Sequence, residues 1–113
     1  MDSTQFTPVT PQLLEEIVAK IIAVGSPLKI VLFGSQARGN ARPDSDIDLL
    51  LIEETDLPIW KRAARYYKAL GNLTLPHDIL VRTPSEIHEW SAVPNAFLTV
   101  ATREGRVLYE KPT

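Results

Sequence analysis

The chain has 113 residues, 44% of them hydrophobic, and a formal net charge of −2. This size suits one domain with a core, and no apolar run approaches the length that spans a membrane. Cysteine is absent, which excludes a disulfide framework and a thiolate metal site. The slightly acidic balance gives no support to direct nucleic-acid binding. The N-terminus lacks the features of a signal peptide, so we expect a cytoplasmic location and no membrane contact.

The N-terminal part predicts a tail followed by a helix. Residues 1–9 have few periodic apolar positions and are expected to be a flexible tail ahead of a single domain over residues 10–110. Thr10 and Pro11 are typical of a helix start. The apolar positions that follow recur at helical spacing: Leu13, Leu14, Ile17, Val18, Ile21 and Ile22. Gly25 is expected to end this helix.

Two apolar runs, residues 29–33 and 46–52, predict the first two strands. Both are nearly continuous in apolar residues, which favours central positions in a sheet that is covered on both faces. A polar, glycine-containing loop joins them. Gly34 permits a sharp turn and a close backbone approach to a ligand. Ser35 offers a hydroxyl and a backbone N–H to a phosphate oxygen, and a helix starting there would add an anion site.

The second run opens with two carboxylates. Asp46 and Asp48 are two residues apart, so on a strand both side chains point to the same face. Two acids on one face repel each other unless a cation binds between them. Hard oxygen ligands of this kind suit Mg²⁺, which keeps some waters and takes substrate phosphates as further ligands. The pattern therefore predicts a metal and triphosphate site.

The following segments predict a helix over residues 57–70 and a third strand over residues 75–81. The acidic residues 53–56 read as a solvated turn in preference to a second metal cluster. A basic stripe on the helix reads as a solvated face, or else as a docking face for an acidic partner or a triphosphate: Lys61, Arg62, Arg65 and Lys68. Pro76 is compatible with a strand at a sheet edge or with the first residue of a strand, and Asp78 shares a face with Leu80 by alternation.

The C-terminal part predicts two short helices and a last strand. Thr83 and Glu86 form a capping box for a helix that ends at Trp90. Residues 95–104 predict the next helix, and residues 106–109 the last strand. This alternation of helices and strands predicts an α/β fold with a small mixed sheet flanked by helices.

The spacing of the two half-motifs resembles a known family. The segments Phe33-Gly34-Ser35-x-Ala37-Arg38-Gly39 and Ser45-Asp46-Ile47-Asp48-Leu49-Leu50 are similar to the signature of the minimal nucleotidyltransferase (MNT) domains. These belong to the DNA polymerase beta superfamily and include antitoxins paired with HEPN toxins. The resemblance extends from about Pro11 to the C-terminal strand and is less specific outside the motif.

The resemblance implies roles for particular residues. Asp46, Asp48 and Asp78 would bind magnesium as catalytic carboxylates, and Asp78 would help to deprotonate the acceptor. Gly34, Ser35 and Arg38 would hold the phosphates of ATP, the implied donor. No second, acceptor-binding domain is evident, so the acceptor is expected on a partner. The resemblance implies AMP transfer to a tyrosine of a HEPN ribonuclease toxin, which neutralises it.

Two alternatives remain open at this stage. The chain could be a non-catalytic antitoxin that masks its toxin by binding alone. A complete carboxylate set argues against this, because neighbouring acids have an electrostatic cost. The second alternative is a nucleotidyltransferase that modifies a small-molecule antibiotic, which the absence of an evident acceptor domain disfavours.

Overall fold

Four strands form one mixed sheet. The structure is a computed structural model that describes residues 9–34, 46–93 and 97–112. The strands are β1 (Lys29–Phe33), β2 (Ile47–Ile52), β3 (His77–Arg82) and β4 (Arg106–Glu110), in the spatial order β3-β2-β1-β4. β1 is antiparallel to both β2 and β4, and β2 is parallel to β3. The predicted α/β class is confirmed, as are the central positions of the first two strands, and the third strand lies at a sheet edge.

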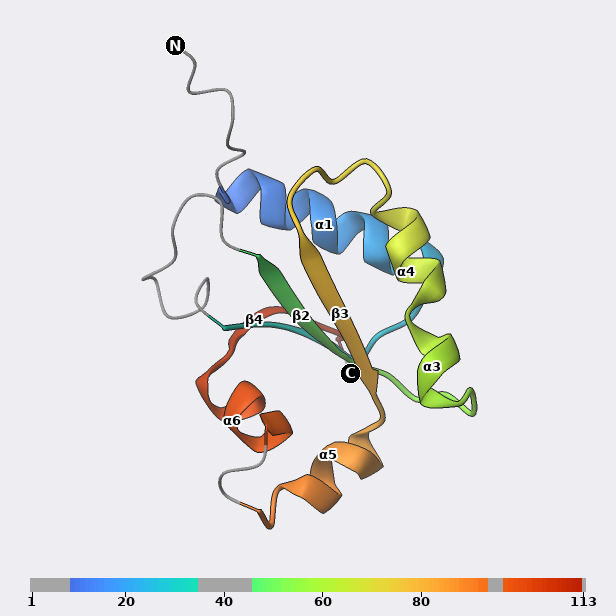
Figure 1. The fold of residues 1–113 in the computed structure, drawn as a ribbon, viewed down its shortest axis with the longest axis vertical. Helices are drawn as coiled ribbons and strands as arrows, with labels where there is room; N and C mark the ends of the chain where they lie inside the picture. The colour runs from blue at the N-terminus through green and yellow to red at the C-terminus, as the bar shows by residue number, and fades with distance from the viewer. Residues whose placement is uncertain (1–8, 35–45, 94–96, 113) are drawn as a thin grey trace.

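Helices cover both faces of this sheet (Figure 1). On one face lie α1 (Pro11–Val24) and α4 (Ala64–Ala69), preceded by the single turn α3 (Ile59–Arg62). On the other lie α5 (Pro84–Trp90) and α6 (Phe97–Glu104). Among the described residues, no helix combines the length and the apolar character that crossing a bilayer requires.

Alternation along β2 divides the core between the two faces. Ile47, Leu49 and Leu51 are fully buried against the α1 and α4 side. The next residues along the strand, Asp48 and Leu50, point to the α5 and α6 side, where the apolar cluster is smaller. This smaller cluster contains Val31, Phe33, Leu50 and Ala101, with Ile52, Leu80 and Ile87 packed against it. The second face therefore leaves room beside the apolar cluster.

The helix starts follow the predicted chemistry. The Thr10 hydroxyl accepts a hydrogen bond from the Leu13 amide at 3.1 Å, with Pro11 in the first turn. At α5, the Thr83 hydroxyl accepts from the Glu86 amide, and the Glu86 carboxylate accepts from the Thr83 amide. The tail expected over residues 1–9 lies outside the described residues except for Val9, which packs against the core.

The single helix predicted over residues 57–70 is wrong, since two short helices occupy this segment. The Lys61 amide bonds to the Pro58 carbonyl, three residues back, which tightens the first turn. The Leu57 carbonyl instead accepts from the Arg62 Nε at 2.8 Å. The helix then restarts at Ala64.

The solvated basic stripe and the solvated acidic turn are also wrong in part. Arg62 is buried and forms a two-pronged ion pair with Glu86, with Nη1 to Oε1 at 2.7 Å and Nη2 to Oε2 at 3.1 Å. Glu53 is buried as well, and it accepts hydrogen bonds from Arg65 and the Tyr66 hydroxyl. Arg62 and Arg65 thus tie α3 and α4 to groups on and beside the sheet, and the buried Arg62 and Glu53 are not available as a docking face.

Candidate active site

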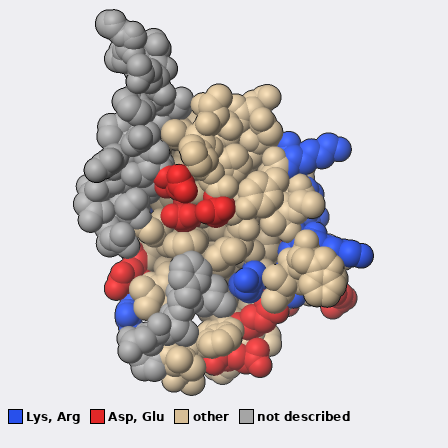
Figure 2. All heavy atoms as spheres, in the orientation of Figure 1, with Lys and Arg blue, Asp and Glu red and all other residues tan. Residues whose placement is uncertain are grey.

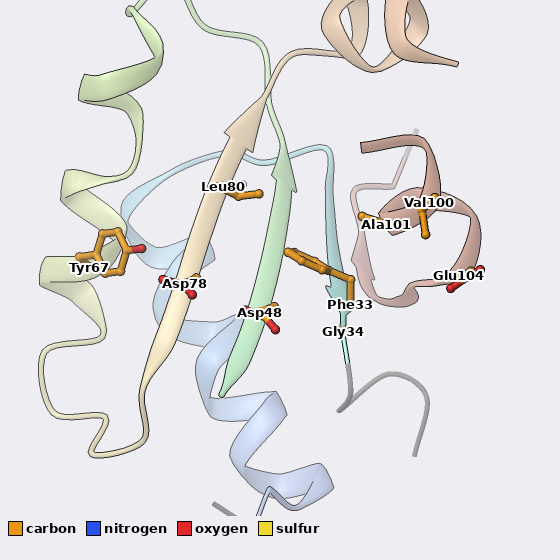
Figure 3. A pocket seen from close by; sticks show the side chains of 9 residues that line it. All are labelled: Phe33, Gly34, Asp48, Tyr67, Asp78, Leu80, Val100, Ala101 and Glu104. Carbon is orange, nitrogen blue, oxygen red and sulfur yellow. The ribbon is translucent and has the colours of Figure 1, made fainter. Parts of the chain in front are cut away.

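The predicted carboxylates lie where three neighbouring strands come side by side. In the sheet register Asp48 pairs with Phe33 of β1 on one side and with Asp78 of β3 on the other. Residues that pair across a sheet point to the same face. Asp48 and Asp78 therefore lie together on the α6 side, as Figure 3 shows. Asp46 lies exposed just before β2.

Gly34 is fitted to this place by its missing side chain. Its φ is +76°, in the left-handed region that glycine adopts without strain. A Cβ atom added at Gly34 would lie 2.6 Å from Oδ2 of Asp48. The turn after β1 therefore approaches the Asp48 carboxylate as closely as backbone atoms allow, and any larger residue would displace that carboxylate.

Among the described residues, the carboxylates of the site have no basic partner. Burial raises the pKa of the Asp48 carboxyl, and the charges of Asp78 and Asp46 raise it further. In the described part of the chain, neither the Asp48 nor the Asp78 carboxylate forms an ion pair or accepts a hydrogen bond. Figure 2 shows acidic atoms over the amino ends of β2 and β3, while most basic side chains lie toward the other side of this view. The arrangement favours a cation as ligand.

This donor set fits magnesium in an open site. Within the described residues, no three His, Cys, Asp or Glu side chains form a ready-made metal cluster. Asp48 and Asp78 supply an adjacent pair, and Asp46 adds its charge nearby. Magnesium characteristically takes one or two carboxylates and completes its shell with waters and phosphate oxygens. An adjacent pair is therefore sufficient for a metal–nucleotide complex.

A cavity of about 490 Å³ opens beside the carboxylates. Its lining comes from β1, β2, β3, α4 and α6: Phe33, Gly34, Asp48, Tyr67, Asp78, Leu80, Val100, Ala101 and Glu104. Figure 3 shows the carboxylates at the strands and the α6 residues on the opposite wall. The cavity thus joins an acidic floor to an apolar wall, which suits a ligand with both a charged and an uncharged part.

Two of the predicted site residues, Ser35 and Arg38, lie outside the described residues, and their roles stay predictions. Two polar residues of the lining, Tyr67 and Glu104, were not predicted from the sequence as site residues. For Tyr67 a signal existed. Adjacent helical residues lie about 100° apart around the helix axis, so Tyr66 and Tyr67 could not both enter the core. Tyr66 is fully buried, and Tyr67 is 39% exposed at the cavity.

A glycine turn and paired aspartates at the ends of adjacent strands, in a sheet of this topology, define a nucleotidyltransferase. The family model described as "Nucleotidyltransferase domain" matches residues 11–98 of this chain. The chain therefore belongs to the nucleotidyltransferase domain family.

One curated protein and one solved structure are similar to this chain. It is 34% identical over 53 residues to a protein of Methanocaldococcus jannaschii that carries the provisional name protein adenylyltransferase. That match covers 47% of this chain and 52% of the relative, so it spans about half of the relative's length. The fold superposes on a crystal structure of a toxin–antitoxin with AMP-PNP with a TM-score of 0.63 at 21% identity. This match covers 87% of this chain and 73% of the other and establishes the fold.

Proposed function

We propose that this protein is a nucleotidyltransferase antitoxin that transfers AMP from ATP to a tyrosine of a HEPN ribonuclease toxin. The observation that carries the chemistry is the in-register pair Asp48 and Asp78, without counter-charge in the described residues, beside the Gly34 turn. The adenylyltransferase name of one relative and the toxin–antitoxin nature of the structural neighbour support the type of acceptor. A cytoplasmic location belongs to the same proposal, because ATP is the donor.

In this proposal, different residues of the chain hold the phosphates, bind the metal and accept the proton. The Gly34 turn lets the backbone approach the triphosphate, and Ser35 and Arg38 hold the departing phosphates. Asp46, Asp48 and Asp78 are the residues that would bind magnesium, which when bound neutralises charge on the phosphate oxygens. Asp78 also receives the proton of the acceptor hydroxyl. The apolar residues of the cavity wall, Leu80, Val100 and Ala101, would contact the uncharged part of the substrate.

Stoichiometry distinguishes transfer from masking. A candidate toxin is incubated with a tenth as much of this protein, with and without ATP and magnesium. Intact mass spectrometry measures added AMP, and an RNA-cleavage assay measures toxin activity. Because an enzyme turns over, we expect AMP on most of the toxin and loss of cleavage only with ATP. Asp48→Asn should abolish both effects.

The binding alternative makes the opposite forecast. A mask must be present in at least equal amount and needs no ATP. If cleavage is blocked only at equimolar protein, with no added mass and no dependence on Asp48, the catalytic proposal fails. Transfer of AMP to an aminoglycoside-type hydroxyl compound, but not to the toxin, would instead assign a small-molecule substrate.

A further inference from the structure

Tyr67 reaches from α4 to the strand that carries Asp78. Its hydroxyl oxygen accepts a hydrogen bond from the Ile79 amide at 2.9 Å. Because β3 is an edge strand, its outward amides have no neighbouring strand to bond with. The tyrosine supplies that missing acceptor at the residue directly after Asp78. Its ring also lies beside His77, with centroids 5.7 Å apart, which fixes its direction.

This bond leaves the proton of the Tyr67 hydroxyl unused. A phenolic O–H donates one hydrogen bond, and its oxygen accepts others. The oxygen already accepts the Ile79 amide, and the O–H has no acceptor among the described residues. The side chain lines the cavity beside Asp78, with its hydroxyl end toward β3 (Figure 3). The Tyr67 O–H is thus a fixed donor at the acidic floor that has no acceptor in the part of the chain that the structure describes.

We propose that Tyr67 is a substrate-binding residue whose hydroxyl donates a hydrogen bond to an oxygen of the reacting substrates. This inference rests on the proposed function and adds a residue outside the sequence motif. Ionised Asp48 and Asp78 can only accept hydrogen bonds, so the Tyr67 O–H beside them supplies a donor that can orient a substrate oxygen. The oxygen belongs either to the nucleotide phosphates or to the acceptor hydroxyl, and both have the same chemistry toward a donor.

Tyr67→Phe removes only the hydroxyl and is the variant to test. Because Tyr67 is 39% exposed, water can take the place of its hydroxyl at the Ile79 amide, so we expect the melting temperature to stay close to that of the wild type. The matched control is Tyr109→Phe on β4, which removes a tyrosine hydroxyl away from the cavity. Amide hydrogen exchange at Ile79, measured by NMR, should be faster in Tyr67→Phe than in the control.

Two measurements distinguish the source of the oxygen. The affinity for magnesium–ATP is measured by calorimetry without acceptor, and the KM for the acceptor is measured in the transfer assay. A phosphate partner predicts about tenfold weaker nucleotide binding, the loss of one hydrogen bond of about 1.4 kcal/mol. An acceptor partner predicts unchanged nucleotide affinity and about tenfold lower kcat/KM for the acceptor. Tyr109→Phe should change neither.

The outcomes that overturn the inference differ from those that overturn the function. If Tyr67→Phe keeps wild-type affinity and wild-type kcat/KM, Tyr67 does not bind substrate and the transfer proposal stands. If its melting temperature falls while both of these stay constant, its role is structural. A wild-type protein that neither binds the nucleotide nor transfers AMP overturns both proposals.

Discussion

The two ends of the parallel pair β2 and β3 carry acidic residues in opposite surroundings. At the amino ends, Asp48 and Asp78 lie side by side without a basic partner among the described residues. Beyond the carboxyl ends, Glu53 is paired with Arg65 and Tyr66, and Glu86 is paired with Arg62. The acids beyond the carboxyl ends thus take part in contacts that hold the fold together, whereas Asp48 and Asp78 make no such contact within the described residues.

The pKa directions follow this contrast. Burial and the neighbouring acids raise the pKa of Asp48. The hydrogen bond from Arg62 lowers the pKa of Glu86. A carboxyl pKa that is raised in the folded state means that ionisation of the group destabilises the fold relative to the unfolded chain. A lowered pKa means that ionisation stabilises the fold. The two ends should therefore respond to mutation and to pH with opposite signs.

The largest effect on stability is expected beyond the carboxyl ends of β2 and β3, the paired end, where Glu53 and Glu86 have basic partners. Arg62→Met keeps much of the buried stem but removes the Arg62 hydrogen bonds to the partly buried Glu86 carboxylate and to the Val81 carbonyl. The carboxylate keeps the Thr83 amide as a donor but loses the charge of its arginine partner. Breaking such a pair should lower the free energy of unfolding by about 3 kcal/mol. Urea denaturation measures this. Lys61→Met, on the exposed neighbouring position, is the control and should change stability by less than about 0.5 kcal/mol.

Equal stability of the two methionine variants would show that the arginine pair contributes nothing. Arg62→Met should also retain magnesium–ATP binding when assayed well below its melting temperature. If the folded variant loses magnesium–ATP binding, the Arg62 and Glu86 pair is not independent of the site at Asp48 and Asp78.

A smaller effect is expected in the pH dependence of stability. At pH 7 Glu86→Gln should be less stable than the wild type. This deficit should disappear as the pH falls from the ordinary value of 4.5 through the lowered pKa, because the wild-type carboxylate becomes protonated.

Asp48→Asn should change stability at pH 7 in the opposite direction. The variant should be more stable than the wild type at pH 7, by under about 1 kcal/mol because solvent screens the site. The gain should vanish below the ordinary value of 3.8, where the carboxyl is protonated in both folded and unfolded states. Thermal unfolding of both variants from pH 3 to 8 measures these differences. A variant Asp48→Asn that is less stable at pH 7 would contradict the repulsion.

Local signals in the sequence predicted most of the arrangement at the amino ends of β2 and β3, where Asp48 and Asp78 lie. Strand alternation places Asp48 and Asp78 on one face, and the apolar runs around them indicate central strands. The register that sets the two side by side depends on the parallel pairing of distant segments, which alternation alone does not determine.

The paired end was missed for the same physical reason. Arg62 and Glu86 are 24 residues apart, and Arg65 and Glu53 are 12 apart. In the sequence these charges look like a solvated stripe and an acidic turn, because nothing local shows that each meets an opposite charge. The contact of Tyr67 was not predicted because its hydrogen bond with the Ile79 amide joins α4 to β3, which are distant in the sequence pattern.

The most direct test of the account is the melting-temperature rise that magnesium–ATP produces in the wild type, in Asp48→Asn and in Glu86→Gln. At about 100 times the dissociation constant, the complex should stabilise the wild type by about 2.7 kcal/mol. We predict that Asp48→Asn loses most of this rise, whereas Glu86→Gln keeps it from a lower starting temperature. An undiminished rise in Asp48→Asn would show that the nucleotide and its metal bind elsewhere, and it would contradict the account.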